Sequence, residues 1–164
     1  MKKRFFILSV IGMLSLGFAA CGSDDEEEQP QKTENNNNNA LANATSYVGL
    51  MNVTMPDAPT YSNPTAECLC ALGTDKMTIV LLNAKFAENM PVTLDSVKVE
   101  GIAYTKDAEG EVSFSGENIV PILKGVPFAK YTLSSLQGSI KGDSLQFKCS
   151  MGEFPLSYVG VEKK

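Results

Sequence analysis

Apolar and polar residues alternate along the chain from residue 46 to residue 164. Turn-forming residues interrupt the alternation roughly every 8 to 12 positions, which is typical of short antiparallel β-strands. The first predicted strand places alternate residues from Tyr47 to Met55 on one face and ends at Pro56 and Pro59. Further strands are predicted over residues 66–72, 76–86, 92–104 with a bend near Gly101, 111–117, 119–123, 131–140, 144–151 and 156–162.

Each of these strands must bury one face, and a closed barrel or a two-sheet sandwich achieves this. Ser46-Tyr47-Val48-Gly49 recurs as Ser157-Tyr158-Val159-Gly160, in the first and the last predicted strand. In a closed barrel the first and the last strand pair with each other, so similar sequences in these two strands favour a barrel. The alternative is that two β-rich tetrapeptides are similar by chance. We therefore predict an all-β fold, an antiparallel up-and-down barrel of about eight strands, with a two-sheet β-sandwich as the alternative.

The N-terminus has the three parts of an export signal. Residues 1–4 are basic, residues 5–18 are mostly apolar, and the small residues Ala19 and Ala20 precede Cys21. The uncharged stretch is shorter than the roughly 20 residues of a membrane-spanning helix, which argues against a retained helix. Phe18-Ala19-Ala20-Cys21 resembles the lipobox of bacterial lipoproteins. The resemblance implies cleavage after Ala20 and acyl chains on Cys21 that hold the protein to a membrane.

Residues 21–45 are predicted to form a disordered tether, because their acidic and asparagine-rich sequence cannot offset the entropy of ordering. The acidic cluster of the tether resembles the signal that sends lipoproteins of Bacteroidetes to the cell surface. A solvated charge run that extends the tether is the alternative. The chain is thus divided into a signal peptide (1–20), a tether (21–45) and a β-domain (46–164). The expected location is the cell-surface face of the outer membrane, with its periplasmic face as the alternative. The cluster consists of Asp24, Asp25, Glu26, Glu27 and Glu28.

A second resemblance covers most of residues 46–164. Residues 47–54, Phe114-Ser115-Gly116 and residues 133–140 are similar to segments of calycin-like lipoproteins of Bacteroidetes. The resemblance implies an eight-stranded, lipocalin-like barrel whose activity is uncharacterised. The lipocalin signature contains a tryptophan, and this chain has none. The resemblance therefore does not imply that the domain binds ligands as lipocalins do.

The composition removes several classes of function. From residue 46 onward there are 10 lysines, 13 acids and no arginine, which is the wrong charge balance for nucleic acid. The absence of histidine removes Ser-His-Asp and Cys-His catalysis and histidine metal sites. Catalysis by carboxylates remains possible in principle if some of the acids face a cavity. Acids on exposed strand faces are usually solvated, so we predict no enzyme, no catalytic residue and no cofactor. The candidate acids are Glu67, Asp95, Glu100 and Glu117.

Three cysteines remain once Cys21 is assigned to lipid. Cys68 and Cys70 share one face of a predicted strand, and Cys149 lies on another strand. We expect all three to be small buried apolar residues. The alternatives are a disulfide from Cys149 to Cys68 or Cys70, and a three-thiolate metal site that lacks a fourth ligand. We predict no metal site.

The domain is expected to bind a small apolar ligand or a surface protein, because an eight-stranded barrel is either filled or holds one small ligand. A structural surface protein with a filled core and no ligand is the alternative. Asp95-Ser96-Val97 and Asp143-Ser144-Leu145 resemble the O-glycosylation acceptor of exported Bacteroidetes proteins, which implies modification at Ser96 and Ser144. The candidate lining residues, for each of which ordinary core is the preferred interpretation, are Met51, Met77, Leu81, Phe114 and Phe147.

Overall fold

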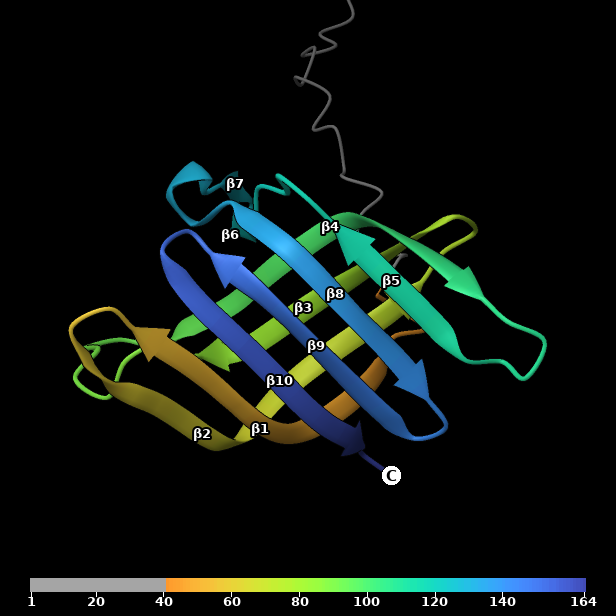
Figure 1. Cartoon of the computed structure of the whole chain (residues 1–164), viewed down its shortest axis with the longest axis horizontal. Coiled ribbons are helices and arrows are strands. Elements are labelled where there is room, and N and C mark those ends of the chain that lie inside the picture. Colours follow the sequence, from red (N-terminus) through yellow and green to blue (C-terminus); the bar gives the residue numbers. More distant parts are fainter. Residues whose placement is uncertain (1–40) are drawn as a thin grey trace, which may run out of the picture. The chain divides into compact units, whose positions relative to one another are not determined.

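The structure, a computed structural model, describes residues 41–164, which form a β-barrel (Figure 1). Its main strands are β1 (Thr45–Met55), β2 (Ala58–Leu72), β3 (Lys76–Ala84), β4 (Leu94–Lys106), β5 (Val112–Gly116), β8 (Leu133–Lys141), β9 (Ser144–Met151) and β10 (Phe154–Glu162). The connection from β5 to β8 contains two short strands, β6 (Ile122–Leu123) and β7 (Val126–Pro127), and the 3-10 helix η2 (Ala129–Tyr131).

The eight main strands form one closed, antiparallel, up-and-down barrel. Each pairs with the main strand before and after it in sequence, and β1 pairs with β10 to complete the circle. The barrel is the architecture that calycin-like proteins have. The predicted barrel is therefore confirmed, and the β-sandwich alternative is excluded. In Figure 1, β5, β8, β9 and β10 lie in front, and β2, β3 and β4 cross behind them.

Strand β2 begins at Ala58, so the predicted start at residue 66 was wrong. The first half of β2 pairs with β1, whereas pairing with β3 begins only at Glu67. The first half is thus a sheet edge on one side, and a sheet edge tolerates the missing N–H groups of Pro59 and Pro64. Pro56 lies between β1 and β2, as a residue that ends a strand does, whereas Pro59 lies within β2.

Strand β4 bends where the sequence indicated. Gly101 has a φ of +74°, a left-handed conformation that favours glycine. The register between β3 and β4 shifts by one residue beside it, since Met77 pairs with Ile102 but Ile79 pairs with Val99. The bend near Gly101 is thus a β-bulge, which re-aims the second half of β4 toward β5.

Most of the predicted strand 119–123 belongs to the connection between β5 and β8. Only Ile122 and Leu123 belong to β6, which pairs with β7 across Lys124 and Gly125. Both turn residues have positive φ, 50° and 80°, as a two-residue type I′ hairpin turn requires. The sequence prediction did not include this small hairpin or η2, because neither has enough residues to show a periodic pattern.

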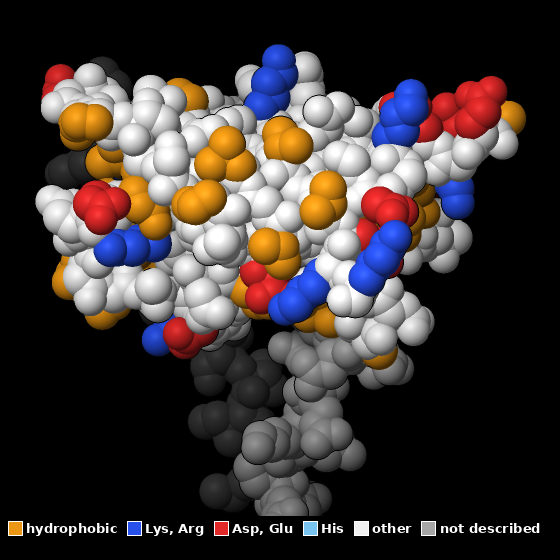
Figure 2. Space-filling view, turned by 90° about the horizontal axis from the view of Figure 1, so that it is seen from below, with side chains coloured by type: hydrophobic (Ala, Val, Ile, Leu, Met, Phe, Trp, Pro, Cys, Tyr) orange, Lys and Arg blue, Asp and Glu red, His pale blue; other side chains and the backbone are white. Residues whose placement is uncertain are grey.

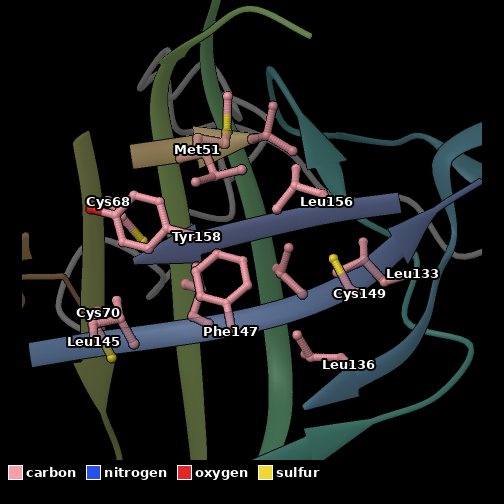
Figure 3. Close-up of a cluster of buried hydrophobic side chains, with 14 of the residues drawn as sticks. Met51, Cys68, Cys70, Leu133, Leu136, Leu145, Phe147, Cys149, Leu156 and Tyr158 are labelled. Atoms are coloured by element: carbon pink, nitrogen blue, oxygen red, sulfur yellow. The ribbon is translucent and has the colours of Figure 1, made fainter. Parts of the chain in front are cut away.

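Alternate side chains of every main strand point inward and form a single packed core (Figure 3). The rings of Phe147 and Tyr158 stack across β9 and β10 with centroids 5.3 Å apart. The buried Tyr158 hydroxyl donates to the carbonyl oxygen of Ala66 on β2 at 3.3 Å, so one side chain links both sides of the closure. Among residues 41–164 no buried side-chain nitrogen or oxygen lacks a hydrogen-bond partner.

The two ends of the barrel differ. The end that we call the closed pole contains Thr45, Glu162 and short turns between strands. There the Tyr104 hydroxyl donates to the carbonyl oxygen of Gly73 at 2.5 Å, and the Lys163 amide donates to the carbonyl of Ser46. The other end, which we call the open pole, contains the two longest connections, residues 85–93 and 117–132.

Candidate functional site

The open pole contains an apolar pocket of about 400 Å³. This volume lies within the range of roughly 300–1,000 Å³ that small-molecule sites occupy. The ends of β1, β4 and β10 contribute to it, together with both long connections. The lining residues are Met55, Phe86, Ala87, Asn89, Met90, Pro91, Leu94, Leu123, Phe128, Tyr131 and Phe154.

Local backbone bonds place the connections around this pocket. The amide of Phe128 donates to the carbonyl of Pro121 at 2.8 Å, which folds the second connection back on itself. The amide of Tyr131 donates to the carbonyl of Phe128 at 3.0 Å and begins η2. In the first connection the amide of Phe86 donates to the sulfur of Met90 at 3.5 Å. Both connections thus present aromatic side chains to the pole.

Three aromatic rings lie in a row along one wall. The Tyr131 centroid is 4.9 Å from that of Phe128 and 6.1 Å from that of Phe154. The ammonium of Lys130 lies 5.7 Å from the Tyr131 centroid, within the range of a cation–π contact. Outside the lining, Val92 and Val126 of the same two connections are 62 % and 64 % exposed. The wall therefore offers ring faces and few hydrogen-bonding groups.

The chemistry of the pocket is that of apolar binding. Asn89 and Tyr131 carry the polar side chains of its lining, and no Asp, Glu, Lys or Arg is among the lining residues. Proton transfer near neutral pH needs a titratable group within hydrogen-bond reach of the ligand. The lining supplies hydrophobic and aromatic contact area with two neutral polar groups, and no acid or base for such a step.

The five predicted interior residues lie elsewhere. Met51, Met77, Leu81, Phe114 and Phe147 all belong to the packed core, with exposures of 7 % or less. None lines the pocket at the open pole. The core interpretation of these residues is confirmed, and the ligand-lining interpretation is wrong. Sequence alternation identifies inward strand residues, whereas the pocket is built largely from non-periodic connections.

The four candidate acids do not converge. Glu67 accepts hydrogen bonds from the Ser46 hydroxyl at 3.0 Å and from the Lys163 ammonium at 3.3 Å, and these bonds lower the pKa of its carboxyl. Glu100 pairs with Lys98 at 2.7 Å. Asp95 is exposed and lies 3.8 Å from the Lys124 ammonium, and Glu117 is also exposed. None of the four lines the pocket; Asp95 and Glu117 are solvated, whereas Glu67 and Glu100 are half-buried.

Cys68, Cys70 and Cys149 are free and buried, which confirms the expectation of three small apolar residues and contradicts the disulfide alternative. Burial raises the pKa of the Cys70 and Cys149 thiols to about 12 and also raises the pKa of the Cys68 thiol well above its usual value. Within residues 41–164 no group of three or more His, Cys, Asp or Glu side chains is placed to hold a metal ion. The thiols are therefore packing residues.

The outer face of the barrel carries mixed side chains. Two shallow depressions of about 410 and 380 Å³ lie over β8, β9 and β10 and are lined mainly by serine, glutamine and Lys148. Beside them Leu50 and Val159 pair directly across β1 and β10 and are 42 % and 53 % exposed. Figure 2 shows apolar side chains separated by polar atoms on the face that it presents.

Several predicted sites lie outside the described residues: the signal segment, Ala19, Ala20, Cys21 and the acidic cluster 24–28. Of the two glycosylation candidates, Ser96 is half-buried on β4, and the half-buried Ser144 donates to the carbonyl of Gly160 at 3.5 Å. Within the part of the chain that the structure describes, no helix is long and apolar enough to span a bilayer.

No protein-family model, curated protein or solved structure matches this chain. The assignment of the fold therefore depends on the closed eight-stranded geometry, and the candidate site depends on the pocket at the open pole.

Proposed function

We propose that the protein is a lipid-anchored surface protein whose barrel binds a small apolar ligand in the pocket at the open pole. The observation that carries the proposal is the pocket itself, which combines about 400 Å³ with an uncharged, mainly aromatic and aliphatic lining. Such sites bind by removing apolar ligand surface from water, at roughly 25 cal/mol per Å². Asn89 and Tyr131 provide polar groups that orient a ligand.

The position of the pocket supports this role for a tethered domain. Thr45, the first residue of β1, lies at the closed pole, and Met55, at the other end of the strand, lines the pocket. A strand of 11 residues spans roughly 36 Å at about 3.3 Å per residue. Thr45, where the N-terminal segment joins the barrel, and the pocket therefore lie at opposite ends of β1.

Ligand binding is tested with 1-N-phenylnaphthylamine, a probe whose fluorescence rises in apolar sites. We expect saturable binding to the full-length chain and at least a tenfold weaker affinity for Leu123→Asp, which places a carboxylate in the apolar lining. The matched control is Val126→Asp, because Val126 lies on the same hairpin but outside the lining. Equal affinities for the two variants, or no probe binding to the wild type, would contradict the proposal.

The anchor is tested separately in cells. Metabolic labelling with a palmitate analogue is expected to mark the wild type and not Cys21→Ala, because the lipobox resemblance assigns the acyl chains to that thiol. Replacement of residues 24–28 by Asn and Gln is expected to retain the label but to protect the barrel from protease added to intact cells. Retained protease sensitivity would favour the interpretation of the cluster as a solvated spacer.

A second candidate function is a structural surface component with a filled core. The observation that favours it lies at the closure of the barrel, where Leu50, Val159 and Val161 are exposed and Val48, which pairs with Val161, is half-buried. Native mass spectrometry of the protein from cells distinguishes the two candidates. A co-purified small molecule supports the binding role, and a co-purified protein without any small molecule supports the structural one. That the protein is not an enzyme stays a prediction.

A further inference from the structure

A row of polar side chains crosses the outer face of four neighbouring strands, of which β8, β9 and β10 lie in front in Figure 1. Asn52 of β1 pairs directly with Ser157 of β10. Ser157 pairs with Lys148 of β9, which pairs in turn with Gln137 of β8. All four residues line the depression of about 410 Å³, and all but Asn52 also line that of about 380 Å³. The two depressions therefore adjoin, and we call them together the outer groove.

The outer groove is polar but carries almost no charge. Apart from Lys148, Pro155 and Val159, the outward side chains of its lining are serine, threonine, asparagine and glutamine. No Asp or Glu lines it, although acids outnumber lysines by 13 to 10 from residue 46 onward. None of the ion pairs among residues 41–164 includes Lys148. Lys148 thus gives the outer groove a positive charge that no carboxylate in the lining offsets.

Hydrogen bonds hold several of these side chains in place. The Ser62 hydroxyl donates to Oδ1 of Asn52 at 2.6 Å. This bond uses the oxygen of Asn52, so its NH₂ group, which only donates, is the part that remains for a ligand. In the smaller depression Nε2 of Gln146 donates to the Ser139 hydroxyl at 3.2 Å. Side chains that are fixed before binding lose less conformational entropy when a ligand arrives.

A β-bulge shapes one side of the outer groove. Ser134 of β8 pairs with Ser150 of β9, but Gln137 pairs with Lys148, so β8 contains one extra residue at this point. Within the bulge Ser135 has a φ of +53°, in the left-handed region that few residues other than glycine adopt. Bulges re-aim side chains, and they are frequent next to functional sites. Here the bulge brings both Ser135 and Gln137 to the larger depression.

We propose that the outer groove binds an acidic glycan, with the carboxylate of one uronate unit at the Lys148 ammonium and neighbouring sugar rings in the two depressions. Sugar hydroxyls both donate and accept hydrogen bonds, as the serine and threonine hydroxyls of the lining do. Neighbouring strands lie about 4.8 Å apart, which is close to the length of one hexose unit along a chain. Successive sugar rings therefore match successive strands along the row from Asn52 to Gln137.

The charge and the pairing of the strands favour this ligand over others. A charge-assisted hydrogen bond from Lys148 is stronger than a neutral one, so a carboxylate adds affinity that a neutral sugar lacks. A peptide that binds as an added strand needs an open sheet edge. Strands β8, β9 and β10 are each paired on both sides, so their main-chain groups are already bonded within the barrel. The outer groove shares no lining residue with the pocket at the open pole.

The experiment measures the binding of labelled oligosaccharides to the full-length chain carrying Cys21→Ser. The probes are fluorescent oligomers of galacturonate, of guluronate and of hyaluronate, and fluorescence polarisation follows their binding. We expect at least one of the three to bind saturably. The carboxyl methyl ester of the bound oligomer keeps the sugar rings and loses the charge. We expect this ester to bind about tenfold more weakly or less, because the charge-assisted hydrogen bond is lost.

Variants of the protein locate the site. Lys148→Gln is expected to weaken binding of the acidic oligomer about tenfold or more, because it removes the ammonium. Gln137→Ala removes a neutral hydrogen-bonding group that lines both depressions and is expected to weaken binding about fivefold. The matched control is Lys76→Gln, which makes the same change in net charge at an exposed residue outside the outer groove. We expect it to leave the affinity unchanged.

The outcomes keep this inference apart from the proposed function. Leu123→Asp, in the pocket at the open pole, is expected to leave oligosaccharide binding unchanged, and Lys148→Gln is expected to leave 1-N-phenylnaphthylamine binding unchanged. Three results would each overturn this inference: no binding of any acidic oligomer, equal affinity for the methyl ester, or equal affinities of Lys148→Gln and Lys76→Gln. A wild type that binds no 1-N-phenylnaphthylamine overturns the proposed function alone.

Discussion

Gly49 and Gly160 lie directly opposite each other on β1 and β10, where the barrel closes. A Cβ atom on Gly49 would overlap the carbonyl oxygen of Val159 and the Cα of Gly160. A Cβ atom on Gly160 would overlap the hydroxyl of Tyr158, which reaches across it toward β2. The glycines end the two copies of the recurring tetrapeptide: Gly49 is required by the close approach of the β10 backbone, and Gly160 by the position of the Tyr158 side chain.

Gly49→Ala is expected to destabilise the barrel, because the added methyl group meets backbone atoms that cannot rotate away. Overpacking of this kind costs about 1–3 kcal/mol of the free energy of unfolding. Urea unfolding followed by circular dichroism measures the change. The control Val159→Ala alters an exposed outer side chain of β10 and is expected to change the free energy by about 0.5 kcal/mol or less. Equal stability of the two variants would contradict the closure argument.

Tyr158→Phe is expected to lower the free energy of unfolding by about 0.5–1.5 kcal/mol, because it removes the buried hydrogen bond to Ala66 and leaves that carbonyl with one partner fewer. The same unfolding measurement applies. Tyr104→Phe is the matched control, since its hydroxyl bonds to the carbonyl of Gly73 at an exposed position, where water replaces it. A larger loss in Tyr104→Phe than in Tyr158→Phe would show that the link across the closure is not stabilising.

The sequence predicted the barrel well because its signal is local. Met51, Val53, Leu145 and Phe147 alternate with polar neighbours, and the structure buries all four. A period of two depends only on the strand geometry of each segment, so it is visible without knowledge of the pairing. The first half of β2 was missed because prolines normally argue against a strand. They are tolerated here because this half pairs with β1 on one side only, which the sequence does not reveal.

The candidate site could not be predicted in the same way. Phe86, Phe128, Tyr131 and Phe154 come from three separate parts of the chain, and three of them lie outside the strands. No periodic pattern links them, and they meet only because the barrel closes and its two long connections share one pole. A cluster of aromatic residues next to Pro91 and Pro121 was the available signal, but it does not indicate which connections lie at the same end.

Stability is expected to fall in alkali. Burial raises the pKa of Cys70 and Cys149 from 9.0 to about 12, and burial followed by nearby negative charges raises that of Tyr47 from 10.0 to about 12. Above pH 9 the unfolded chain loses these protons while the folded chain keeps them, so the free energy of unfolding decreases as the pH rises toward 12. The urea midpoint measured between pH 7 and pH 11 tests this.

The control for the alkaline effect is the double variant Cys70→Ala and Cys149→Ala. It is expected to be less stable at pH 7, because each substitution removes a buried sulfur, but its midpoint should decline less steeply above pH 9. The chain has no histidine, so we expect little change between pH 6 and pH 8. A midpoint that declines equally in both proteins above pH 9 would assign the effect to groups other than the thiols.

The three described thiols are expected to react only after unfolding. Cys68, Cys70 and Cys149 are 0 %, 3 % and 6 % exposed, and burial holds each thiol in its protonated, unreactive form. In the Cys21→Ser chain, 5,5′-dithiobis(2-nitrobenzoic acid) should therefore release no colour in buffer and three equivalents in urea. Ser157→Cys, on the outer face of β10, is the positive control and should react at once in buffer. Rapid reaction of the Cys21→Ser chain in buffer would mean that the barrel opens far more often than its packed core implies.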